Sequence, residues 1–212
     1  MAMDYNTYLT RLAAMATAST TDTKFTTIVP AVIDYAEQRM YRELQLVSTQ
    51  SRNQAGLTSS GVRTFNFPTR FVIAEAINLI ISSQRFPLMP ASREFIDFVY
   101  GTASNGVPVY YAMETDQSIS LGPTPNGAYT VEIVGRVRPT PLSSGTPNTF
   151  LTDYLPDAFL ACSMIFYSGF QKNFAAQSSN PQQGTSWEDQ YTKLMASAQV
   201  EELRKRFTQA PQ

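Results

Sequence analysis

Histidine is absent from this 212-residue chain, and cysteine occurs once. Without histidine, the sequence lacks the side chain that most often serves as a general base or a metal ligand near neutral pH. The single cysteine, Cys162, excludes an intrachain disulfide and a thiolate metal cluster. Because Cys162 lies in an apolar run and no histidine can activate it, we interpret it as a buried structural thiol rather than a nucleophile.

Charge and long hydrophobic runs are also scarce. Charged residues make up 16% of the chain, below the ~25% of ordinary globular domains, and the formal net charge is -1. This balance argues against a bulk polycation that binds nucleic acid. No run reaches the ~18 apolar residues of a membrane span, so we expect no membrane insertion. Residues 1–4 carry no basic residue, which argues against a secretory signal.

Phosphate-binding glycine motifs are missing as well, since neither GxGxxG nor GxxxxGK[ST] occurs. The serine pairs at 82–83 and 143–144 have no histidine partner for a catalytic triad. Asp153 and Asp157 stand at i, i+4, a spacing that could serve acid–base chemistry or bind a hard cation. We favour a helix cap for Asp153 and a helix-dipole contact for Asp157. The sequence therefore predicts no enzyme, no cofactor and no metal site.

The order of the patterns that are present is informative. Residues 1–47 and 150–212 carry apolar residues at helical spacing, whereas 48–149 alternate with period 2 between Gly, Pro and Asn. We predict an α+β fold in which about four helices from both chain ends form a helical body. Residues 48–149 are then an inserted, antiparallel, β-rich lobe.

Two helices are predicted before the lobe. Asp4 is a candidate N-cap for the first. The second is predicted to begin near Thr27 to Pro30, because proline is tolerated in a first turn. Its predicted buried face consists of apolar residues: Val29, Val32, Ile33, Ala36, Met40 and Leu44. Its predicted outer face is charged: Asp34, Glu37, Arg39 and Glu43.

Two further helices are predicted after the lobe. The third begins after Thr152 or Asp153, and residues 173–184 form a polar, helix-breaking loop. A capping-box pattern from Ser186 to Asp189 predicts the start of the fourth. The side chains expected to face inward on that helix are Trp187, Tyr191, Leu194, Met195 and Ala198.

Residues 71–81 are ambiguous between strand and helix. We favour a strand because β-branched residues are dense and a turn signal follows at 82–85. Ser92 is expected to open one short helix, and 129–137 alternate as a strand. The aromatic residues of the lobe could stack on nucleic acid beside its arginines, but we favour a sheet core. These residues are Phe65, Phe67, Tyr110, Tyr111 and Tyr129, with Arg63, Arg70, Arg85, Arg136 and Arg138.

The densest basic cluster is Arg204, Lys205 and Arg206, followed by Phe207. Cations are favoured at the C-terminal end of a helix by its dipole, which would account for the cluster without a partner. Alternatively, the cluster and Phe207 dock on an acidic surface of another protein. We expect residues 208–212 to be a poorly ordered end.

Several segments, in order, resemble one protein family. Residues 31–44 resemble the second helix of phage head–tail adaptors, the head-completion or tail-tubular connector proteins of short-tailed phages. Residues 106–112 are similar to that family's G-x-P-x-Y-Y-A strand, and 121–129 to its L-x-P-x-P-x-G-x-Y turn. Residues 155–159 resemble the opening of the helix that follows the linker.

The resemblance implies a structural subunit that forms a ring, typically of twelve copies, at the head–tail junction of a virion after synthesis in the host cytoplasm. It implies as partners the portal protein, a tail nozzle or tube protein, further copies of the chain, and double-stranded DNA passing without sequence recognition. We therefore expect Arg204, Lys205, Arg206 and Phe207 to dock on the portal. The alternatives are another tail or baseplate subunit of a virion, or a binding module built on the β lobe.

Overall fold

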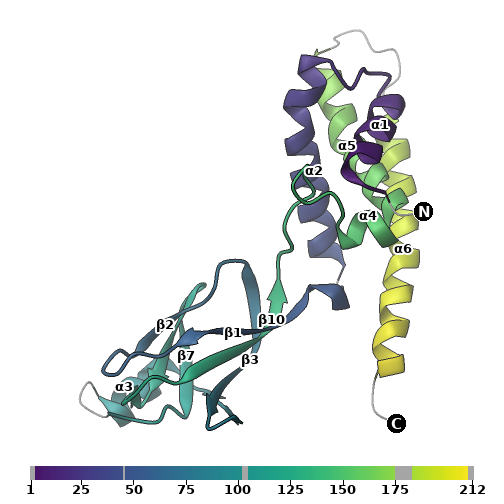
Figure 1. Cartoon of the computed structure of the whole chain (residues 1–212). Coiled ribbons are helices and arrows are strands. Elements are labelled where there is room, and N and C mark those ends of the chain that lie inside the picture. Colours follow the sequence, from purple (N-terminus) through teal and green to yellow (C-terminus); the bar gives the residue numbers. More distant parts are fainter. Residues whose placement is uncertain (1–2, 45, 102–104, 175–182, 210–212) are drawn as a thin grey trace. The chain divides into compact units, whose positions relative to one another are not determined.

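The chain divides into two compact units in the computed structural model, which describes residues 3–44, 46–101, 105–174 and 183–209. The first unit contains Met1–Ser48 and Pro139–Gln212, and the second is Thr49–Arg138. The first is built from helices and the second mainly from strands (Figure 1). Both chain ends therefore contribute to one helical unit, and the predicted α+β class is confirmed.

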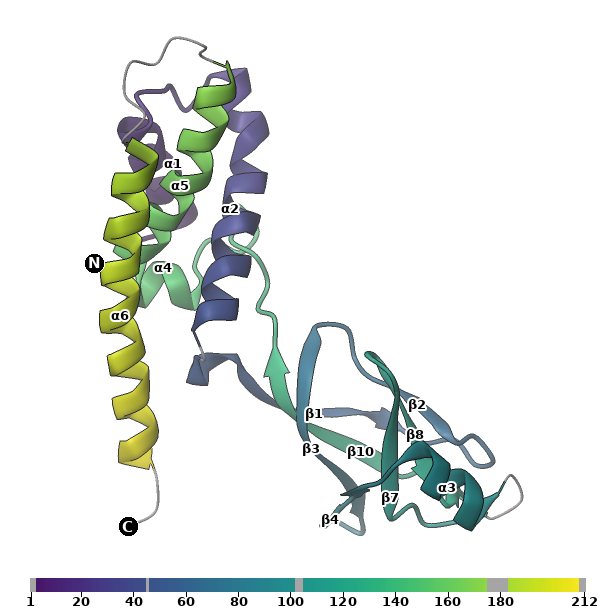
Figure 2. The ribbon, with the colours of Figure 1, turned by 180° about the vertical axis from the view of Figure 1, so that it is seen from behind.

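The helical unit consists of α1 (Tyr5–Met15), α2 (Thr23–Glu43), α4 (Phe150–Tyr154), α5 (Pro156–Phe174) and α6 (Gln183–Gln209). Helix α5 packs against α1, α2 and α6, and Figures 1 and 2 show it among them from opposite sides. The apolar stripes meet in one core around α5. Its largest fully buried side chains include Tyr8, Leu12, Phe25, Met40, Phe159 and Tyr191.

Side-chain caps set several helix starts. The Asp4 carboxylate accepts the N–H of Thr7 at 2.7 Å, as predicted, and Asp22 accepts the N–H of Lys24 at 2.9 Å. Thr149 forms a reciprocal capping box with Thr152, so the helical structure after the lobe begins at Phe150. These bonds satisfy backbone donors that have no partner inside the helix.

The structure corrects two predictions for α2. The helix begins at Thr23, so Pro30 lies inside it instead of in its first turn. Thr26 and Pro30 are both exposed, so water can reach the Thr26 carbonyl that the missing proline N–H leaves unpaired. Glu37 was assigned to the outer face but is only 4% exposed. Its place four residues after Ile33 and three before Met40 puts it on the buried side.

Predicted boundaries near the C-terminal end also shift. Helix α5 runs to Phe174 and α6 begins at Gln183, so the predicted loop at 173–184 is helical at both ends. Residues 175–182 lie outside the described residues. Ser186 and the predicted capping box lie inside α6. The helix continues through Gln209, so Thr208 and Gln209 are helical, whereas 210–212 fall outside the described residues.

The second unit contains two four-stranded sheets. The first has the order β1 (Gln50–Leu57), β10 (Thr130–Val137), β3 (Phe71–Ile81), β4 (Gln84–Pro87), and all its neighbours are antiparallel. The second has the order β2 (Thr64–Asn66), β8 (Ser118–Gly122), β7 (Tyr110–Thr115), β5 (Met89–Pro90), with only β5 and β7 parallel. Strands β6 (Asn105–Gly106) and β9 (Thr124–Pro125) form a short parallel pair. The strand prediction for 71–81 is confirmed.

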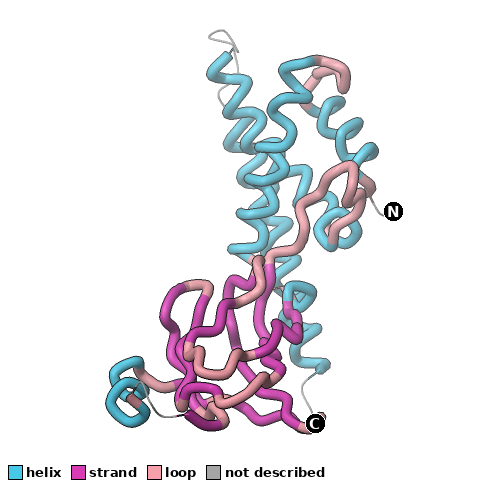
Figure 3. Tube along the Cα trace, turned by 60° about the vertical axis from the view of Figure 1, so that its left-hand side comes forward, coloured by secondary structure: helices cyan, strands magenta, loops and turns pink. Residues whose placement is uncertain are grey.

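Alternating residues from both sheets fill a second core. Leu79 and Val131 are register partners in the first sheet, and Ile119 and Leu121 belong to the second; all four are completely buried. The single helix of this unit within the described residues is α3 (Arg93–Tyr100) (Figure 3). Its N-cap is Ser92, as predicted. It packs on β7 and β8 through the buried Ile96. Phe65 and Phe67, considered above for base stacking, lie in this core.

Candidate interaction surfaces

The C-terminal end of α6 holds the predicted docking residues. Lys205 is bound within the helical unit, because its Nζ lies 3.0 Å from Glu201 Oε1 and 2.7 Å from Glu202 Oε1. The hydrogen bond to Glu202 is the largest influence raising the pKa of Lys205. Its ammonium group also lies 5.4 Å from the centre of the Phe150 ring. The ion pairs of Lys205 thus lie within α6, and its position near the Phe150 ring is a contact with α4.

The remaining docking residues are placed differently. Arg204 is exposed on α6. Arg206 and Phe207 belong to α6 by their backbone, while their side chains lie outside the described set. The docking role of these four residues therefore stays a prediction, of which the described side chains are those of Arg204 and Lys205.

An exposed apolar row, missed in the sequence analysis, lies on the side of α6 that turns away from its own unit. Val200 and Leu203 are 48% and 53% exposed, while Tyr191, Met195 and Ala198 are buried on the opposite side. Phe207 follows Val200 by seven residues, so helical geometry places its Cα in the same row. The spacing i, i+3, i+7 of Val200, Leu203 and Phe207 is the sequence pattern that could have predicted this row. Figures 1 and 2 show the end of α6 extending past the neighbouring helices of its unit.

Most of the lobe arginines considered for nucleic-acid binding form ion pairs. Arg63 lies 2.8 Å from Asp97, Arg85 lies 2.9 Å from Glu132, and Arg136 lies 3.1 Å from Glu75. Tyr111 and Tyr129 pack against the lobe core. Paired arginines and packed aromatics favour the sheet-core interpretation over a stacking face.

A second exposed apolar surface surrounds α3, and we call it the α3 patch. Its side chains are Phe95, Phe98 and Val99 from the helix with Met89 from β5. Phe98 is 91% exposed, and the other three are between 42% and 56% exposed. The patch is continuous through Tyr110, whose ring centre lies 5.4 Å from that of Phe95 and which is the register partner of Met89. Exposed aromatic groups of this kind mark interaction surfaces.

The acidic and thiol groups weighed as reactive have structural contacts. Asp157 accepts the N–H of Ala158 at 2.8 Å, and Asp153 accepts a hydrogen bond from Asn148 at 3.0 Å. Burial raises the pKa of Cys162 to about 12. Within the described ranges, no three His, Cys, Asp or Glu side chains are grouped to hold a metal. No helix in that part of the chain combines the length and apolarity needed to cross a membrane.

The comparison with protein families is decisive for identity. The model of the SU10 adaptor protein family matches residues 3–211, which is nearly the whole chain. The chain belongs to the SU10 adaptor protein family. This confirms the resemblance to phage head–tail adaptors. No curated protein matches the chain.

Family membership makes this adaptor a structural component of a phage, and adaptors of this kind contact other virion proteins. The match covers both units, so the helical unit and the lobe are parts of one family architecture. Surfaces that contact other proteins are therefore the functional features to identify in the adaptor.

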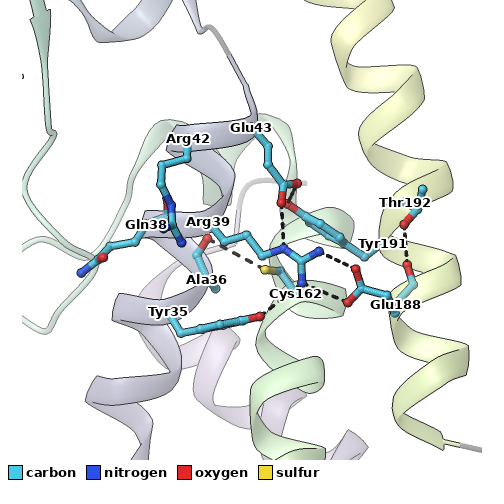
Figure 4. Close-up of polar contacts among 10 residues, drawn as sticks. All are labelled: Tyr35, Ala36, Gln38, Arg39, Arg42, Glu43, Cys162, Glu188, Tyr191 and Thr192. Atoms are coloured by element: carbon cyan, nitrogen blue, oxygen red, sulfur yellow. Dashed lines mark hydrogen bonds and ion pairs between the residues drawn. The ribbon is translucent and has the colours of Figure 1, made fainter. Parts of the chain in front are cut away.

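A polar cluster that the sequence analysis also missed attaches α6 to α2 in the adaptor (Figure 4). The Arg39 guanidinium donates to both carboxylate oxygens of Glu188 and, at 2.9 Å, to Glu43. It also lies 4.6 Å from the centre of the Tyr191 ring, and the Tyr191 hydroxyl donates to Glu43 at 2.7 Å. We call Arg39, Glu43, Glu188 and Tyr191 the Arg39 cluster.

The charges of the Arg39 cluster reinforce one another. The Arg39 side chain is 19% exposed. Its hydrogen bonds, above all those to Glu188, raise the pKa of Arg39, and the same contact lowers the pKa of Glu188. Arg39 and Glu43 stand four residues apart in the sequence, but Glu188 is 149 residues away from Arg39. The cluster holds α6 in place and so determines where its exposed row points.

Proposed function

We propose that this adaptor forms a ring at the head–tail junction, joins the portal to the tail, and surrounds the passage for DNA. The observation that carries the proposal is the family match over residues 3–211. Two features support it further: the chain forms two compact units, and each unit has its own exposed apolar surface. A net charge of -1 suits DNA that passes without being retained, because tight binding requires many cationic phosphate contacts.

The portal contact is assigned to the C-terminal end of α6. Arg204, Arg206 and Phe207 are the residue types that anchor protein interfaces, and Val200 and Leu203 extend the apolar row. Lys205 supports this surface from behind through Glu201 and Glu202. A small contact on each subunit becomes firm when it is repeated around a ring.

Light scattering coupled to sizing tests the proposal, with the adaptor alone and with a purified portal ring. A portal-dependent ring of about twelve adaptor copies is the expected result, by the family resemblance. An assembly that forms without the portal and ignores it would favour a different tail or baseplate subunit, or a binding module built on the lobe.

Truncation tests the docking surface separately. Deleting residues 204–212 should leave the melting temperature nearly unchanged, because the Lys205 ion pairs that it removes join residues of the same helix and contribute about 0–1 kcal/mol. The same deletion should abolish attachment to portal-bearing capsids. Leu203→Glu tests the apolar row alone. Its control is Lys193→Glu, which also introduces a glutamate at an exposed position of α6, in the N-terminal half of that helix. If the truncated chain attaches to capsids at wild-type occupancy, the portal contact must lie on another surface of the adaptor.

The tail contact is assigned to the lobe, with the α3 patch as its centre. Phe98 is the most exposed of the lobe's large apolar side chains, so Phe98→Asp should leave folding intact and weaken binding of the tail nozzle protein at least tenfold. Leu57→Asp, at an exposed apolar site outside the patch, is the control. Equal tail binding by Phe98→Asp and wild type would exclude the patch.

A further inference from the structure

A buried carboxylate lies where the chain returns from the lobe to the helices. Glu37 belongs to α2 and shares its buried side with Ile33 and Met40. Its Oε1 accepts the backbone N–H of Leu142 at 2.9 Å, across 105 residues of sequence. Leu142 is itself 3% exposed and packs in the helical core. We call residues 139–149, between β10 and α4, the return segment.

Two of the contacts that hold the return segment follow one another along the chain. The first is Leu142, held by Glu37 and by burial of its side chain. The second is Pro147, whose carbonyl accepts the N–H of Tyr5 at 2.8 Å. Between them lies a tight turn in which Ser143 and Thr146 pair with each other. If the first point opened, the second would still hold the segment to α1.

The surroundings of Glu37 make its negative charge costly. Burial is the main influence that raises the pKa of Glu37 to about 7, and Asp34 one turn earlier adds to it. The Leu142 N–H acts in the opposite direction. Tyr8 of α1 also faces Glu37, and the Tyr8 hydroxyl donates to Ser163 of α5 at 3.0 Å. Among the described residues, the charged and titratable groups found to interact with Glu37 are thus Asp34 and Tyr8, and neither is a cation.

We propose that Glu37 is a pH-dependent lock on the return segment, closed on Leu142 when the carboxyl is neutral and opened when it ionises. A neutral carboxyl still accepts the Leu142 N–H through its carbonyl oxygen, without the cost of a buried charge. In the open state, Glu37 is hydrated and the segment is held from Pro147 onward. Leu142 and the turn between Ser143 and Thr146 are then released, while Pro147 stays bound to Tyr5.

The sign of the pH effect follows from linkage. In the closed state Glu37 ionises near pH 7, and in the hydrated open state it ionises near its ordinary value of 4.5. Opening therefore becomes about tenfold more favourable with each pH unit between these values and levels off above pH 7. The return segment is therefore held most firmly at acidic pH. The equilibrium constant for opening changes by at most about 300-fold between the acidic and the alkaline limit.

Hydrogen exchange of the full-length chain between pH 5 and pH 8 tests the lock. Protection factors, corrected for the intrinsic pH dependence of exchange, are compared for a peptide spanning 139–146 and for a reference peptide from β10. The expected result is a fall of about tenfold per pH unit up to pH 7 for the first peptide alone. Protection that is flat or that rises with pH in the wild-type chain would overturn the proposal.

Two variants sharpen the test. Glu37→Gln keeps the shape and an acceptor for Leu142 but cannot ionise, so its return segment should stay protected at every pH. Asp34→Asn removes the nearest like charge, so its midpoint should move to lower pH. A Glu37→Gln profile identical to that of the wild type would overturn the proposal. The measurement uses the adaptor without portal or tail, so its outcome is independent of the proposed ring.

Discussion

Replacing Arg39 by alanine should loosen α6 from α2. The guanidinium is the only member of the Arg39 cluster that contacts the other three, through hydrogen bonds to Glu43 and Glu188 and its position over the Tyr191 ring. Its removal leaves two carboxylates of like charge on facing helices. The Tyr191 hydroxyl would remain hydrogen-bonded to Glu43, so the loss is concentrated in the link to Glu188.

The magnitude follows from the burial of each partner. Exposed ion pairs contribute about 0–1 kcal/mol, whereas breaking a buried pair costs about 3–5 kcal/mol. Arg39 is 19% exposed, but Glu43 and Glu188 are 39% and 41% exposed and can be partly hydrated after the change. With loss of the packing over Tyr191, we expect Arg39→Ala to reduce the free energy of unfolding by about 2–3 kcal/mol. Arg39→Lys should recover about half, since an ammonium group cannot form the two-pronged contact.

Urea unfolding followed by tryptophan fluorescence measures this loss. Trp187 is the sole tryptophan of the chain and packs against the helical core beside Glu188, so its emission reports on this unit. Arg42→Ala is the matched control, because Arg42 is exposed and bonds only a carbonyl of its own helix among its described contacts. It should cost less than about 0.5 kcal/mol. The reasoning is refuted if both variants unfold alike, or if a double-mutant cycle with Glu188→Gln gives no coupling.

Three further predictions concern particular residues: Gly135 and Glu132 of the lobe and Gly169 of the helical unit. A Cβ on Gly135 would lie 2.0 Å from the Ile73 carbonyl oxygen at a bulge of β10, so Gly135→Ala should destabilise the lobe by about 3 kcal/mol or more in thermal unfolding followed by circular dichroism. Gly169→Ala meets no atom within 4 Å and should stabilise α5 by about 0.5–1 kcal/mol; destabilisation by Gly169→Ala would contradict the open space there. Glu132 is buried and its pKa is lowered, first by its hydrogen bond from Arg85, so lobe stability should fall as pH drops below 4.5. Glu132→Gln should remove that part of the pH dependence, and an unchanged acid profile would show that other carboxylates cause it.

Local features of the fold were readable from the residues themselves. The stripe from Val29 to Leu44 is buried as predicted, and Asp4 and Ser92 cap the helices that follow them. Such signals act over one or two turns, so neighbouring residues are sufficient to encode them. The same holds for the strand at 71–81, where β-branched residues precede a turn at Ser82 and Ser83. The boundaries of α6 were missed because helical structure continues through residues that cap or break helices elsewhere.

By itself, the sequence determined the α+β class, the family resemblance, and the absence of histidine chemistry from the adaptor. The tertiary structure decided which charged groups are surface and which are not. Lys205 of α6 lies 5.4 Å from the centre of the Phe150 ring of α4, Arg39 binds a glutamate 149 residues away, and Glu37 meets a backbone N–H 105 residues away. The physical reason is that burial and charge pairing depend on partners brought together by packing. A one-dimensional pattern records the spacing of charges along one helix, but not the surface that this helix will meet.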